Sequence, residues 1–159
     1  MSRQEAVNPK VNILLVDDRR ENLLALEGIL KSLDQNLVQA MSGAQALKYL
    51  LRNDVAVILL DVEMPDMDGF QTATLIRERE KTRHTPIIFL TAISKSDVHV
   101  SQGYSLGGVD YIFKPFAPDV LKSKVAAFVE MFKQRQEAQR QSALLKAERD
   151  FVSAVLIVA

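Results

Sequence analysis

The sequence contains no cysteine. Without thiols, the chain has no disulfide framework, no thiolate metal site and no thiol nucleophile. Glycine and proline are scarce, at six and five residues, which excludes a low-complexity chain. A charge excess is also missing, because 20 lysine and arginine residues balance 20 aspartate and glutamate residues. This balance gives no support to a nucleic-acid binder or to a binder of anionic membranes, which would carry a basic excess.

Long hydrophobic runs are absent as well. No apolar stretch approaches the roughly 20 residues of a membrane-spanning helix. The polar residues 1–10 lack the apolar centre of a secretory signal and are interpreted as a disordered lead-in. We therefore expect a cytoplasmic protein without a membrane partner. The 159 residues are 48% hydrophobic and 25% charged, which suits one globular domain with an appendage.

Short apolar runs alternate with helical patterns along the chain. The run from Val55 to Leu60 has no polar alternation, which indicates a strand buried on both faces of a parallel sheet. Similar runs predict further strands at 11–16, 37–41, 86–90 and 109–113. Apolar residues at helical spacing predict helices at 20–33, from 42, at 70–81, at 95–106 and from about 118. The alternation predicts an α/β fold: a doubly wound five-stranded parallel sheet (flavodoxin-like, strand order 2-1-3-4-5) with five helices, the last of them extended.

Four of the predicted strands end in residues that can carry chemistry. Asp17 and Asp18 follow the first strand, Asp61 the third, Thr91 the fourth and Lys114 the fifth. The carboxyl ends of parallel strands share one edge of the sheet, so these residues should meet there. Three neighbouring carboxylates repel one another unless a cation is present. Neither histidine nor cysteine is nearby, so the ligands are all oxygen, which favours Mg²⁺.

The same residues suit phosphoryl transfer. A metal ion and the ammonium group of Lys114 would neutralise charge on the transferring group, Thr91 would offer a hydroxyl, and Asp61 would be the nucleophile. Taken alone, Asp17 and Asp18 could form a turn or a helix cap; the other strand ends argue against that interpretation.

Several motifs in order carry a resemblance to a known family: Leu15-Val16-Asp17-Asp18, Asp61-x-x-Met64-Pro65-x-Met67-Asp68-Gly69, Thr91-Ala92 and Lys114-Pro115-Phe116. Each motif is weak alone, but together at these spacings they resemble the receiver domain of bacterial two-component response regulators. The resemblance covers residues 11 to about 130. It implies that Asp61 accepts a phosphoryl group from the phosphohistidine of a sensor histidine kinase or phosphotransfer protein.

The resemblance also implies roles for the neighbours of Asp61. Mg²⁺ would be held by Asp17, Asp18, Asp61 and the backbone carbonyl of Glu63. Lys114 would pair with the carboxylate or with a phosphoryl oxygen.

A switch is implied by the resemblance as well. The Lys114-Pro115 peptide bond would be cis and would aim the lysine into the pocket. A phosphoryl oxygen would draw the Thr91 hydroxyl inward, and Tyr111 would turn from solvent into the vacated space. The change would be read on the face formed by the fourth helix, the fifth strand and the fifth helix.

Residues 131–159 form a helical extension. No glycine or proline follows Pro118, so one long helix should leave the domain near residue 130. The extension is either a solvated linker helix or a two-stranded coiled coil that joins two copies of the chain, and we favour the homodimer. The apolar end, 151–159, needs a partner and resembles junctions that lead into a sensor or output domain. We therefore expect a longer parent protein. The 3-4 spacing of the candidate seam is kept by Phe128, Met131, Arg135, Ala138, Ser142, Leu145, Arg149, Val152, Leu156 and Ala159.

A different functional class stays open from the sequence. A Mg²⁺-dependent phosphohydrolase can also use an aspartyl phosphate, and it carries a second acid two residues past the nucleophile, where Glu63 stands. The pairs Asp17-Asp18 and Lys114-Pro115 fit a receiver better. We therefore predict a signalling domain that is not itself an enzyme, either a module of a larger hybrid kinase or signalling enzyme, or a stand-alone regulator.

Overall fold

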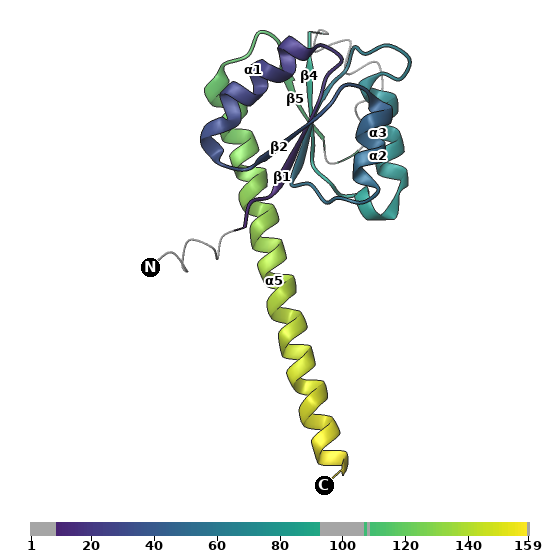
Figure 1. The fold of residues 1–159 in the computed structure, drawn as a ribbon, viewed down its shortest axis with the longest axis vertical. Helices are drawn as coiled ribbons and strands as arrows, with labels where there is room; N and C mark the ends of the chain where they lie inside the picture. Colours follow the sequence, from purple (N-terminus) through teal and green to yellow (C-terminus); the bar gives the residue numbers. More distant parts are fainter. Residues whose placement is uncertain (1–8, 93–106, 108, 159) are drawn as a thin grey trace.

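The structure is a computed structural model that describes residues 9–92, 107 and 109–158. Five parallel strands form one sheet in the order β2-β1-β3-β4-β5, which confirms the predicted fold class (Figure 1). The strands are β1 (Asn12–Val16), β2 (Asn36–Ala40), β3 (Val57–Asp61), β4 (Ile87–Thr91) and β5 (Val109–Phe113). Each lies within two residues of its predicted bounds, and β3 and β4 include the polar residues Asp61 and Thr91 that the prediction placed just beyond them.

Helices alternate with the strands. The α-helices of the described residues are α1 (Arg20–Leu30), α2 (Gly43–Leu50), α3 (Gly69–Glu78) and α5 (Pro118–Val158). Short 3₁₀ helices follow two of them, η2 (Lys31–Leu33) and η3 (Glu80–Thr82). The helix predicted at 95–106 lies outside the described residues.

Helix α3 ends earlier than predicted. The pattern predicted a helix over 70–81, but Arg79 has an extended backbone (φ −85°, ψ 132°) and separates α3 from η3. The buried hydroxyl of Thr82 donates a hydrogen bond of 2.6 Å to the carbonyl oxygen of Ile76. This bond gives a carbonyl near the helix end a partner that a continuing helix would otherwise have supplied.

Helices cover both faces of the sheet. Helices α1 and α5 lie on one face and α2 and α3 on the other (Figure 1). Successive residues of β3 serve the two cores in turn: Leu59 packs in the core below α1 and α5, whereas Ile58 and Leu60 pack in the core below α2 and α3. All five residues of β3 are buried, so the strand that delivers Asp61 is held from both sides.

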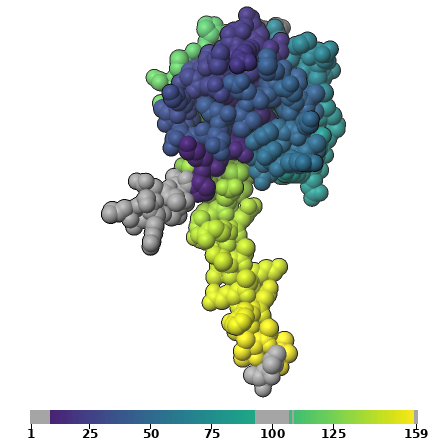
Figure 2. All heavy atoms as spheres, viewed as in Figure 1, coloured from purple at the N-terminus to yellow at the C-terminus, as the bar shows by residue number. Residues whose placement is uncertain are grey.

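Helix α5 continues far beyond the domain (Figure 2). Its first turns are anchored by the buried side chains of Leu121, Val125 and Val129. Every residue from Gln134 to Ile157 is exposed. The 41 residues of the helix span about 60 Å. Neither α5 nor any other helix in the described part of the chain is apolar over a length that could cross a membrane.

The start of α3 is pressed against the end of β3. Asp68 caps the helix: its carboxylate accepts a hydrogen bond of 2.8 Å from the Gln71 amide, and the Gln71 side chain accepts one of 2.9 Å from the Asp68 amide. The Gly69 amide donates to the Val62 carbonyl at 2.8 Å. A Cβ at Gly69 would overlap the backbone carbonyl oxygen of Asp61 and lie 2.8 Å from Cα of Val62. This close approach fixes the loop that follows Asp61.

We expect Gly69→Ala to lower the free energy of unfolding by about 1–3 kcal/mol, because the added methyl group meets backbone atoms that cannot turn aside. Gly28→Ala is the matched control. Nothing lies within 4 Å of a Cβ at Gly28, in the last turn of α1, so alanine there should raise stability by roughly 0.5–1 kcal/mol. Urea unfolding of both variants measures the difference. Equal effects of the two substitutions would contradict this account of the β3–α3 junction.

Candidate functional site

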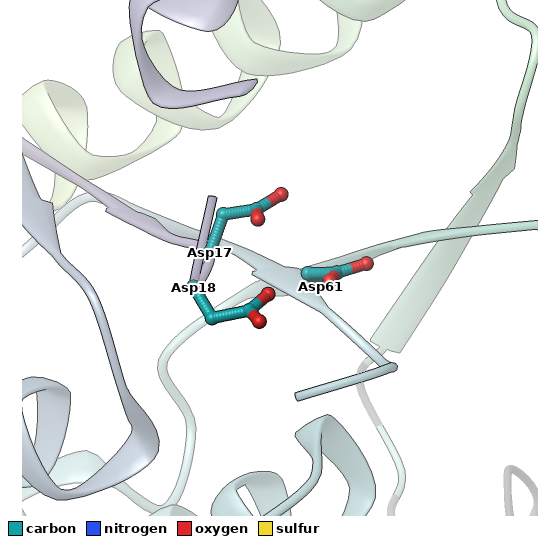
Figure 3. Close-up of side chains that lie close together, drawn as sticks. All are labelled: Asp17, Asp18 and Asp61. Atoms are coloured by element: carbon teal, nitrogen blue, oxygen red, sulfur yellow. The ribbon is translucent and has the colours of Figure 1, made fainter. Parts of the chain in front are cut away.

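Three carboxylates meet at the carboxyl edge of the sheet. Asp17 and Asp18 follow β1, Asp61 is the last residue of β3, and these strands are neighbours. One carboxylate oxygen from each residue lies within 4.8 Å of the other two (Figure 3). Asp17 is 1% exposed and Asp61 7% exposed, whereas Asp18 is half-buried. The strand ends therefore come together as the sequence predicted, in a position largely withdrawn from water.

Asp17 is held by donors from the start of α1. Its Oδ1 accepts a hydrogen bond of 2.9 Å from the backbone amide of Arg19. The side-chain nitrogen of Asn22 lies 3.3 Å from Oδ1 and 3.1 Å from Oδ2. Asn22 is not among the residues that the sequence predicted for the site. Asn22 lies one helical turn before the buried Leu26 and two turns before the buried Leu30. It is therefore a polar residue on the apolar stripe of α1, at the end of the helix nearest the sheet edge, and this position could have indicated a role in the site.

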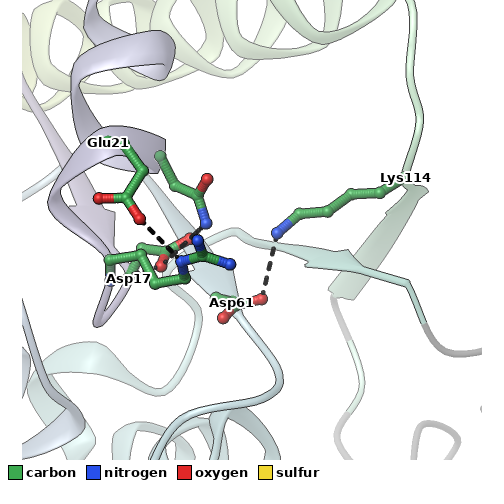
Figure 4. Close-up of polar contacts among 6 residues, drawn as sticks. Asp17, Glu21, Asp61 and Lys114 are labelled. Atoms are coloured by element: carbon green, nitrogen blue, oxygen red, sulfur yellow. Dashed lines mark hydrogen bonds and ion pairs between the residues drawn. The ribbon is translucent and has the colours of Figure 1, made fainter.

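Lys114 reaches the same place from β5. Its Nζ lies 3.5 Å from Oδ1 of Asp61, and the two side chains point toward each other (Figure 4). The backbone amide of Lys114 donates to the carbonyl of Thr91 at 2.8 Å, which joins the ends of β4 and β5. The Lys114-Pro115 peptide bond is cis.

Burial raises the pKa of Asp61 from its ordinary value of 3.8 to about 6. The negative charges of Asp17 and Asp18 act in the same direction, and Lys114 opposes them. The rise means that burial and carboxylate repulsion outweigh the attraction of the single lysine. A further positive charge beside these side chains would therefore be stabilised by them.

The donor set fits a hard divalent cation. Asp17, Asp18 and Asp61 offer only oxygen, and they are the single group of three or more acidic, histidine or cysteine ligands within the described residues. Carboxylate oxygens are the protein ligands that Mg²⁺ prefers, with water filling the remaining positions.

The other predicted residues lie around this cluster. Thr91 is fully buried at the end of β4. The half-buried Tyr111 stacks on Phe89, with ring centroids 5.2 Å apart, and on Phe113 at 6.1 Å. The ring of Tyr111 thus packs against the core in this structure.

The loop after β3 contains three further acids. Glu63 has an exposed side chain, and a role for its backbone carbonyl stays a prediction. Asp66 occupies a turn with a positive φ of 67°, and Asp68 caps α3. Asp66 and Asp68 thus serve as turn and cap residues.

The raised pKa of Asp61 has a consequence for stability. Between pH about 4 and about 6 the folded chain holds a proton on Asp61 that the unfolded chain has lost, so the stability contributed by this group falls as the pH rises through that window. Asp61→Asn resembles the protonated carboxyl. In metal-free buffer at neutral pH, the variant should be more stable than wild type by up to about 3 kcal/mol.

Urea unfolding in the presence of a chelator, repeated from pH 4 to pH 7, measures this difference. The advantage of Asp61→Asn should vanish near pH 4. Asp150→Asn, an equal charge change on the exposed part of α5, should show no such trend. A wild type that is as stable as Asp61→Asn at neutral pH would contradict the electrostatic picture.

Comparison with known proteins assigns the family. Residues 13–126 match the family model for the response regulator receiver domain. The chain is 34% identical over 137 residues to a probable cyclic di-GMP phosphodiesterase of Vibrio cholerae serotype O1, and the aligned segment covers 86% of this chain and 30% of that protein. It is 38% identical over 117 residues to the transcriptional regulatory protein SrrA of Staphylococcus aureus, covering 74% and 47% respectively. The chain thus spans less than half the length of these relatives.

Solved structures agree with this assignment. The chemotaxis protein CheY4 of Vibrio cholerae superposes with a TM-score of 0.68 at 26% identity, over 75% of this chain and 98% of that one. The receiver domain of a signal transduction histidine kinase from Syntrophus aciditrophicus gives 0.69 at 28% identity, over 76% and 90%. The fold, the carboxylate cluster and these comparisons lead to one conclusion: the chain belongs to the response regulator receiver domain family.

Proposed function

We propose that this chain accepts a phosphoryl group on Asp61 from the phosphohistidine of a sensor histidine kinase or a phosphotransfer protein. Such a donor implies a cytoplasmic location. The observation that carries the proposal is the placement of Asp61 between two further carboxylates and the ammonium group of Lys114, 3.5 Å away. Membership of a family of signalling phosphoacceptors supports it.

In the proposed reaction, a carboxylate oxygen of Asp61 attacks phosphorus. The bond between phosphorus and the histidine nitrogen breaks, and its electron pair returns to the imidazole ring. A pKa of about 6 leaves Asp61 mostly ionised at neutral pH and thus nucleophilic. Mg²⁺, when bound by Asp17, Asp18, Asp61 and the backbone carbonyl of Glu63, would neutralise charge on the phosphoryl group. Lys114 would keep its charge beside the new phosphoryl oxygens.

The proposed switch passes from Thr91 to Tyr111. Thr91 ends the strand beside β3, and its backbone is tied to Lys114, so both residues adjoin the carboxylate that changes charge. Tyr111 lies opposite Phe89 in the register of β4 and β5, two residues before the Thr91–Phe113 pair. A hydroxyl drawn toward the phosphoryl group would alter the packing around this aromatic group and the face formed with α5.

We expect wild type to gain the mass of one phosphoryl group when incubated with acetyl phosphate and Mg²⁺. Asp61→Ala should gain none. Lys114→Ala should keep some labelling and lose the conformational response, because the lysine pairs with the phosphoryl group after transfer. Intact-mass spectrometry measures labelling, and amide chemical shifts of Thr91 and Tyr111 measure the response.

Equal chemical-shift changes in phosphorylated wild type and Lys114→Ala would refute the role of Lys114. Rapid multiple turnover of a small phosphoester would favour a Mg²⁺-dependent phosphohydrolase over a receiver. Family membership does not favour that alternative.

We further propose that the receiver acts through α5 as a module of a larger signalling protein, rather than as a stand-alone regulator. The two relatives described above are both longer than the matched segment. Exposed apolar side chains along the last turns of α5 support the need for a partner: Leu144 is 56% exposed, Phe151 69% and Leu156 72%.

A second copy of the chain is the partner that we propose for α5. Leu145, Val152 and Leu156 keep the 3-4 spacing of a coiled-coil seam and are 61%, 50% and 72% exposed. At 100° per residue, Leu145 lies roughly 160° around the helix axis from Val129, which packs on the receiver domain. Val152 and Leu156 lie at similar angles, so this part of the seam faces away from the Val129 contact, and a second helix can approach it without meeting the sheet and its covering helices. Phe128, the first residue of the candidate seam, packs on the domain core instead.

We expect the chain to sediment as a dimer at high concentration. Val152→Asp should shift it to a monomer, because it places a charge in the seam. Ser153→Asp, the same charge one residue along and outside the seam, should leave the dimer intact. Sedimentation velocity measures the state of each variant. A wild-type monomer at high concentration, with or without a phosphoryl analogue, would end the proposal of dimerisation through α5.

A further inference from the structure

We infer that Asn22 is a positioning residue for the Asp17 carboxylate in the proposed Mg²⁺ site. The inference rests on the proposed function and extends it to a residue outside the strand ends. Its basis is the contact of one side-chain nitrogen with both oxygens of a buried carboxylate, at 3.3 Å and 3.1 Å.

Asn22 itself is held in place. Asn22 is half-buried in the first turn of α1, and the next residue, Leu23, is fully buried. Its backbone amide donates to the carbonyl of Arg19 at 3.1 Å. Leu26, one turn later, is 4% exposed and anchors the same stripe of the helix in the core. The helix is thus a firm base from which the amide group reaches Asp17.

Together, two donors restrict the rotation of the Asp17 carboxylate. The Arg19 amide binds Oδ1 at 2.9 Å, and the Asn22 amide group, which has two hydrogens, spans both oxygens. Oδ1 has two donors and Oδ2 only one. Each carboxylate oxygen has about two lone-pair sites, so Oδ2 keeps more capacity for a cation.

The chemistry of asparagine suits this position better than that of the charged residues. A lysine or arginine here would compete with the cation for Asp17, and an acid would add a fourth negative charge to a group that already repels itself. A neutral donor satisfies the buried carboxylate and leaves the site its negative charge. Outer partners of this kind, when removed, typically cost 10–100-fold in metal affinity.

The test is Asn22→Leu, which has nearly the same shape and no donor. We expect its dissociation constant for Mg²⁺, measured by calorimetry, to rise at least about 10-fold. The rate of labelling by acetyl phosphate should fall at low Mg²⁺ and return to the wild-type rate at saturating Mg²⁺, because Asn22 does not touch the phosphoryl group. Asn22→Ala repeats the test with a smaller side chain, in case the leucine variant does not fold.

Asn36→Leu is the matched control. Asn36 is the first residue of β2, at the amino-terminal edge of the sheet and thus opposite the carboxyl edge that holds the carboxylates. Its side chain donates a hydrogen bond of 3.2 Å to Asn12. This variant should bind Mg²⁺ as wild type does. Wild-type Mg²⁺ affinity in both Asn22 variants would overturn the positioning role alone, as would a labelling defect that saturating Mg²⁺ does not restore. A wild type that binds no Mg²⁺ and takes no label would instead overturn the proposed function, and the positioning role with it.

Discussion

Repulsion among three carboxylates is the constraint on which the site depends. Asp17, Asp18 and Asp61 are brought within 4.8 Å of one another because β1 and β3 are adjacent parallel strands whose ends face the same edge. Two of the three are nearly excluded from water, so neither solvent nor Lys114 alone compensates their charge, and the pKa of Asp61 rises to about 6. The fold holds these groups in an arrangement that favours a divalent cation, because its charge would offset their repulsion.

The rest of the domain can be understood as the support for that arrangement. Strand β3 packs against apolar cores on both faces, and this packing holds Asp61 beside the other two carboxylates in spite of their repulsion. Gly69 lets α3 start directly against the Asp61 backbone, and the Asp68 cap fixes the loop between them. On the other side, α1 carries donors to Asp17. The donors to Asp17 are a backbone amide and a neutral side chain, so neither contact places a second positive charge beside the acids.

Much of this could be predicted from the sequence, because the information is local. Unbroken apolar runs marked the strands, and the polar residues at the ends of four of these runs marked the site. What could not be predicted depends on side-chain contacts between neighbouring elements, which the apolar pattern of each element alone does not show. The early end of α3 is stabilised by the Thr82 hydroxyl, and Asn22 is seen as a partner of Asp17 only when α1 is docked on the sheet. The spacing of apolar residues along α5 could be read from the sequence, but the direction in which they face relative to the domain required the helix register that Val129 sets.

The central claim is that Asp61, rather than one of its acidic neighbours, carries the phosphoryl group. Reductive trapping tests it most directly, because borohydride converts an aspartyl phosphate to homoserine, which peptide mass spectrometry can locate. The account predicts homoserine at position 61 in the phosphorylated chain. Homoserine at Asp17 or Asp18, with Asp61 unchanged, would contradict it.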